Sequence, residues 1–127
     1  MYNYTVNTGK DFETAVADLE KALSQHSFGV LWKLDVKEKL AEKGVHFDGR
    51  LKILEVCNPH KAKEALERNI NTGYFLPCKV IVYVEDGQTK MGTIKPSVMM
   101  GMIEGGVPDT LAAEVEEVLV KSLEAAK

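Results

Sequence analysis

The chain has 127 residues, of which 45% are hydrophobic, and its 16 Lys and Arg against 19 Asp and Glu give a formal net charge of −3. This length and hydrophobic content fit a single domain that buries roughly two-thirds of its unfolded surface. The mixed charge gives no electrostatic reason to expect binding to nucleic acid or to an anionic membrane.

The expected compartment follows from the cysteines and from the lack of targeting segments. No basic segment precedes an apolar stretch at the start of the sequence, and the longest uninterrupted apolar run, residues 98–103, is far shorter than the ~20 residues of a membrane span. The sequence has two cysteines and no secretion signal, which argues against a disulfide framework. We therefore expect a soluble, cytoplasmic protein with reduced thiols.

The first third of the chain alternates between strand and helix patterns. Residues 2–6 alternate apolar with polar side chains, which predicts a strand with one buried face. Asp11 is a suitable cap for a helix that ends near His26 and carries an apolar stripe. Residues 28–36 predict a second half-buried strand. The apolar side of this second strand consists of Val30, Trp32, Leu34 and Val36.

Residues 51–83 form the centre of the predicted fold and read as strand, helix, loop and strand. Asn58 suits a helix cap and Pro59 suits the first helical position. The loop of about nine residues that follows the helix is long enough, at ~3.3 Å per residue, to return past it. Such a return makes the two strands antiparallel and brings Cys57 and Cys78 to one end of the sheet, whereas a parallel crossover separates them.

The last third adds a hairpin and a final helix. Asp86-Gly87 between extended segments is typical of a two-residue hairpin turn, because both central positions of that turn need a positive φ. A fifth strand follows at residues 90–95 and Pro96 closes it. Pro108 and Asp109 then open a helix that continues to the end of the chain.

The element order is β-α-β-β-α-β-β-α, and it defines the predicted fold class. One-sided alternation and a hairpin favour an α+β fold, with a single, mainly antiparallel sheet of about five strands and helices on one face. The turn after the first strand, Asn-Thr-Gly-Lys at residues 7–10, matches neither a dinucleotide fingerprint nor a P-loop. We expect no cofactor.

Cys57 is the main candidate for chemistry because it lies where a strand ends and a helix begins. Unpaired N–H groups and the positive dipole end of a helix favour the thiolate form, and His60 in the first turn is a candidate base or charge partner. The alternative is that Cys57 is a small buried hydrophobe and His60 a surface residue.

Three further residues complete the candidate ligand or thiol site. Cys78 shares an apolar strand face and is expected to be buried. Glu55 projects to the same side of its strand as Cys57 and is either a carboxylate beside the thiol or a solvent-exposed residue. Tyr74 either lines a pocket near Cys78 or packs against the core. The candidate site is therefore Cys57, Cys78, His60, Glu55 and Tyr74.

A paired-cysteine site admits two chemistries. Cys57, His60 and Cys78 supply three zinc ligands where a structural site takes four, and no spacing identifies His46 as the fourth, so we predict no metal. Reversible thiol–disulfide chemistry is the stronger possibility, although the sequence lacks a Cys-X-X-Cys motif. Whether the protein is an enzyme stays open.

Three motifs carry a family resemblance. Ile-Leu-Glu-Val-Cys-Asn-Pro at residues 53–59, Leu-Pro-Cys-Lys-Val at residues 76–80 and Val-Tyr-Val-Glu-Asp-Gly at residues 82–87 resemble the small prokaryotic family called domain of unknown function 302. The resemblance covers most of the chain. It implies an α+β fold akin to the TATA-box-binding-protein architecture and a homodimer, and it carries over no catalytic residue.

These observations lead to one functional prediction and one alternative. We expect a homodimeric module that binds a small ligand or a protein partner at the two-cysteine pocket, and neither nucleic acid nor a membrane. The alternative is a thiol-dependent redox enzyme, and a transition-metal-binding protein is less favoured.

Overall fold

The computed structural model describes residues 1–103 and 109–127. Its elements in chain order are β1 (Asn3–Thr8), α1 (Phe12–Gln25), β2 (Gly29–Asp35), α2 (Val36–Glu42), β3 (Arg50–Cys57), α3 (Pro59–Arg68), the 3-10 helix η1 (Ile70–Tyr74), β4 (Cys78–Glu85), β5 (Gln88–Ile94), α4 (Pro96–Met100) and α5 (Asp109–Ala126).

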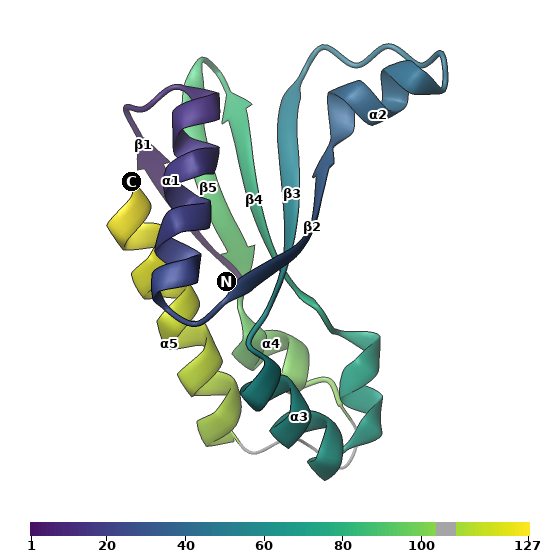
Figure 1. Cartoon of the computed structure of the whole chain (residues 1–127), viewed down its shortest axis with the longest axis vertical. Coiled ribbons are helices and arrows are strands. Elements are labelled where there is room, and N and C mark those ends of the chain that lie inside the picture. Colours follow the sequence, from purple (N-terminus) through teal and green to yellow (C-terminus); the bar gives the residue numbers. More distant parts are fainter. Residues whose placement is uncertain (104–108) are drawn as a thin grey trace.

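The strands form one antiparallel five-stranded sheet in the order β1-β5-β4-β3-β2. Helices α1 and α5 lie side by side over one face of this sheet, while α3 and α4 lie beyond one end of it (Figure 1). The predicted α+β fold class is confirmed. No helix in the described part of the chain is long and apolar enough to cross a membrane.

Helix α1 forms where the apolar spacing predicts it. Asp11 caps the helix, because its Oδ1 accepts a hydrogen bond of 2.8 Å from the backbone N–H of Thr14. The helix ends at Gln25, and His26 is its C-cap. The spacing of three and four residues places one stripe of side chains against the sheet. The buried residues of this stripe are Phe12, Ala15, Val16, Leu19, Ala22 and Leu23.

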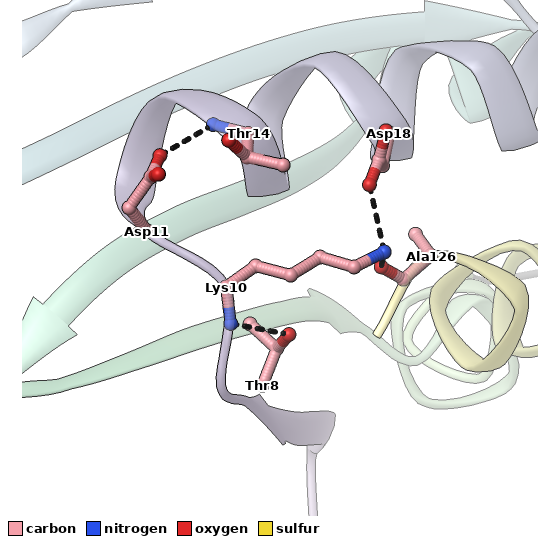
Figure 2. A network of polar contacts seen from close by, with 6 residues as sticks. All are labelled: Thr8, Lys10, Asp11, Thr14, Asp18 and Ala126. Carbon is pink, nitrogen blue, oxygen red and sulfur yellow. Dashed lines mark hydrogen bonds and ion pairs between the residues drawn. The ribbon is translucent and has the colours of Figure 1, made fainter.

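A lysine in the turn between β1 and α1 ties the two covering helices together. Lys10 Nζ lies 2.7 Å from Asp18 Oδ2 on α1 and donates a 2.7 Å hydrogen bond to the carbonyl oxygen of Ala126 at the end of α5 (Figure 2). The last carbonyl groups of a helix have no partner within the helix and carry its negative dipole end. Lys10 therefore satisfies one of these groups with a cation.

The main core lies between the sheet and the α1–α5 layer. It is built from strand residues that point toward these helices and from the helix residues that meet them. The largest fully buried members are Leu19, Leu23, Leu54, Val56, Val80, Val82, Met91, Leu119 and Leu123. A second, smaller cluster contains Ala65 of α3, Met100 of α4 and Leu111 of α5, and it lies beyond the end of the sheet.

Strand β2 corrects one prediction. Val30 pairs with the buried Val56, but the register shifts between Val30 and Trp32, and Trp32 then pairs with Glu55. A bulge of this kind inserts an extra residue and reverses the side to which the following side chains point. Val30 and Trp32 therefore do not share one buried side, and Trp32 is 51% exposed.

The remaining connections agree with the turn signals in the sequence. Asp86 and Gly87 have φ values of 52° and 75° and join β4 to β5 as a hairpin. Pro96 closes β5 as expected and also starts α4, which the sequence analysis did not predict. The last helix is confirmed as α5, while Pro108, expected to open it, lies outside the described residues.

Candidate functional site

The chain doubles back after α3, and this return determines where the cysteines lie. Strands β3 and β4 are antiparallel, with Val56 paired to Cys78. Cys57 is the last residue of β3 and Cys78 is the first residue of β4, so both lie at the same end of the sheet. The antiparallel arrangement predicted from the loop length is confirmed.

A small cavity of about 30 Å³ lies at this end of the sheet, and both cysteines are among the residues that line it. Its other walls come from α3, α4 and α5, including Ala65, Met100 and Ala112. Besides the cysteines, the polar residues of the lining are Asn58 and Lys61. The cavity exceeds the ~10–15 Å³ that one water needs and is far smaller than the ~300–1,000 Å³ of a site for a drug-sized ligand.

The two thiols have different surroundings. Cys78 is 5% exposed, and its burial raises the pKa of its thiol to about 11, with a further contribution from Cys57. Cys78 is therefore a neutral thiol near pH 7. Cys57 is half-buried and precedes the N-cap of α3, where Asn58 Oδ1 accepts a 3.2 Å hydrogen bond from the backbone N–H of Lys61. The predicted helix start beside Cys57 is confirmed.

The register offsets the two cysteines by one residue, so they are not a direct cross-strand pair. Cys78 stands opposite Val56, and Cys57 is one residue further along β3. Because successive strand residues point to opposite faces, the two side chains do not share a face as Val56 and Cys78 do. Both cysteines are free thiols. A disulfide requires Cβ atoms that point toward each other, an arrangement that the one-residue offset between the cysteines does not favour.

Three of the predicted site residues do not line the cavity. His60 is exposed in the first turn of α3, and Tyr74 in η1 is 86% exposed. Glu55 pairs with Trp32 on one side and Lys79 on the other, on the sheet face that α1 and α5 do not cover. The structure therefore gathers Cys57 and Cys78 at the cavity, and places Glu55, His60 and Tyr74 elsewhere.

Lys61 is a cavity residue that the sequence analysis missed. It stands on the first turn of α3 and donates a hydrogen bond to Glu114 of α5, which raises the pKa of the Lys61 ammonium. Its position in the first turn of the helix that follows Cys57 is visible in the sequence and could have predicted that it lies near this thiol. The contributions of Met100 and Ala112 have no comparable signal, because they come from helices distant in the sequence.

The four candidate zinc ligands, Cys57, His60, Cys78 and His46, do not form one cluster. The described residues contain no group of three His, Cys, Asp or Glu side chains able to hold a metal ion. His46 instead contacts Asp48, with 2.6 Å between Nε2 and Oδ1, near the end of β3 opposite to Cys57. Strand β3 separates these ends by roughly 23 Å at ~3.3 Å per residue.

Comparison with known proteins identifies relatives over the whole chain. The family model described as "Domain of unknown function DUF302" matches residues 2–126. A solved structure of an uncharacterised conserved DUF302 protein from Bacillus stearothermophilus is 43% identical, with a TM-score of 0.93, and the match covers 100% of this chain and 99% of that one. No curated protein matches the chain.

Proposed function

The chain belongs to the DUF302 family, and from this premise we propose that it is a cytoplasmic, homodimeric binding module whose ligand site is the cavity at the end of the sheet. The observation that supports this proposal is the convergence of Cys57, Cys78 and Met100 on one apolar cavity. Pockets that combine an apolar lining with a few polar groups are the usual sites of small ligands.

The size and chemistry of the cavity restrict the ligand. A volume of about 30 Å³ accepts a short apolar group and not a ring system. Met100 has a flexible side chain that adapts to the shape of an entering group. Lys61 at the same cavity is a cation, and an entering carboxylate has to share it with, or take it from, its present partner Glu114. We therefore propose a small molecule with a short apolar end and an anionic group that lies beside Lys61.

Propionate and 1-propanol test this proposal, since they share a short apolar end and differ in charge. We expect propionate to shift the amide resonances around Cys57, Cys78 and Met100 in ¹H–¹⁵N spectra, and 1-propanol to shift them less. Ala112→Leu fills the cavity and is expected to abolish the response. Ala113→Leu, on the exposed side of the same helix, is the matched control and is expected to retain it.

The outcomes separate cavity binding from surface effects. Absence of any response in the wild type, or an equal response in Ala112→Leu, overturns the proposed site. If Ala112→Leu does not fold, Lys61→Met decides, because it is expected to remove the preference for propionate over 1-propanol. An unchanged preference in that variant overturns the proposed ligand class.

The redox alternative has less support than the binding module. A buried thiol with a pKa of about 11 is a poor nucleophile and a poor partner in thiol–disulfide exchange near pH 7. The one-residue offset between the two cysteines adds a geometric obstacle to a disulfide.

A further inference from the structure

Two central strands carry large apolar side chains on both faces. In β3, Leu54 and Val56 are fully buried on the helix-covered face, while Leu51 and Ile53 point to the other face. In β4, Val80 and Val82 are fully buried on the helix-covered face, while Ile81 and Tyr83 point to the other face. An antiparallel sheet with one solvated face normally alternates apolar with polar residues, and a sheet covered on both faces does not. The pattern here is that of a sheet covered on both faces.

The register joins these side chains into one continuous surface, which we call the open-face strip. Leu34, Ile53 and Ile81 stand opposite one another across three strands, and Leu51 stands opposite Tyr83 in a parallel row. The strip consists of Trp32, Leu34, Leu51, Ile53, Ile81 and Tyr83. None of these residues belongs to either buried cluster of the described residues, or to the half-buried side chains packed against them.

The exposed area of the chain also exceeds that of a compact monomer. The chain exposes 7349 Å² for a mass of 14.1 kDa. A compact monomer of this mass is expected to expose roughly 6,700 Å². The isolated chain is therefore less compact than an average monomer of its mass.

The charges around the strip favour a second copy as its partner. Glu55 stands opposite Lys79 in the sheet, and Lys90 forms an ion pair of 2.9 Å with Glu85. Each positive side chain on this face thus has a negative neighbour, so the face has no net charge with which to attract a phosphate polymer or an anionic membrane. A two-fold interface brings the same patch together from both subunits, and a patch of balanced charges is complementary to itself.

We infer that a second copy of this chain docks on the open-face strip, so that two sheets stack face to face around a two-fold axis. Stacked sheets lie ~10 Å apart with their side chains interdigitated. If the whole five-stranded face takes part around the strip, strands spaced ~4.8 Å apart and ~20 Å long give two partners a combined projected area of roughly 1,000 Å², close to the lower bound for specific interfaces. This inference rests on the proposed homodimer and names its interface.

Trp32 is the single tryptophan of the chain and reports directly on this interface. In the isolated chain it is 51% exposed, and docking on the strip would bury it. We expect dilution of the wild type to shift its fluorescence to longer wavelength and to increase quenching by acrylamide. Both changes are expected to follow the fall in mass measured by analytical ultracentrifugation.

Ile81→Lys tests the same interface by mutation. The variant places a lysine at the centre of the strip, where the dimer would bury it unpaired in both copies, and we expect dimerisation at least ~100-fold weaker than in the wild type. Ala17→Lys adds the same charge on the exposed side of α1 and is expected to leave dimerisation unchanged.

The outcomes distinguish the homodimer from its interface. A monomer at all concentrations overturns the proposed homodimer and the inference with it. A dimer whose Trp32 emission does not change on dilution, or whose Ile81→Lys variant associates as tightly as the wild type, leaves the homodimer and overturns the interface. The wild-type fluorescence measurement decides the question even if Ile81→Lys does not fold.

Discussion

The two faces of the sheet have similar side chains and opposite surroundings. Leu54 and Val82 are fully buried beneath α1 and α5, while Ile53 and Ile81, their neighbours along the same strands, remain half-buried on the open face. Hydrophobicity therefore does not distinguish the faces. The difference comes from which face the two long helices cover, and it separates residues that stabilise the monomer from residues available for an interface.

The largest expected effect comes from removing three side-chain carbons on each face. Leu54→Ala leaves a cavity in the main core and is expected to lower the free energy of unfolding by roughly 2–5 kcal/mol. Ile53→Ala removes a side chain that is partly exposed and is expected to cost about 1 kcal/mol or less in the monomer. Urea unfolding at a protein concentration below that of dimerisation measures both. Equal losses would show that the open face is as important to the monomer as the core.

The cysteines offer the next test, through the dependence of stability on pH. The pKa of Cys78 is raised from 9.0 to about 11 in the folded chain. As pH rises above the unfolded value, the unfolded chain loses this proton while the folded chain keeps it, so stability falls between about pH 9 and pH 11. The shift corresponds to roughly 2–3 kcal/mol.

Variants at the two cysteines isolate this effect from other groups that titrate in the same range. Cys78→Ala is expected to remove the additional loss of stability between pH 9 and pH 11. Cys57→Ala is expected to retain most of it, because burial is the main cause of the raised pKa of Cys78. Parallel curves of unfolding free energy against pH for the wild type and Cys78→Ala would contradict the assignment of Cys78 to the covered side.

Local sequence patterns predicted the elements that depend on nearby residues. The cap at Asp11, the apolar stripe of α1 and the Asp86-Gly87 turn each follow from residues a few positions apart. The antiparallel return to Cys78 followed from loop length alone. By contrast, the bulge after Val30 arises from the pairing of β2 with β3, and alternation within β2 gives no sign of it.

The candidate site was predictable in part for the same reason. The two cysteines terminate neighbouring strands, so the sheet places them together. Met100 and Ala112 reach the cavity only through the packing of α4 and α5, which no local pattern encodes. The alternation of β3 puts Glu55 on the face opposite to Leu54, but the sequence does not tell which face the helices cover, because apolar residues occupy both.

The smallest expected effect concerns Lys10, which links α1 to α5, the two helices that cover one face of the sheet. Lys10→Met removes both the ion pair with Asp18 and the hydrogen bond to the last turn of α5, and we expect a loss of about 1 kcal/mol in the free energy of unfolding. Lys121→Met removes only an exposed pair with Glu117 within α5 and is expected to cost about 0.3–0.5 kcal/mol. Hydrogen exchange sharpens the test, because only Lys10→Met is expected to speed exchange of the amides in the last turn of α5. If the two variants lose equal stability and exchange alike, the α1–α5 layer is held by its apolar contacts alone.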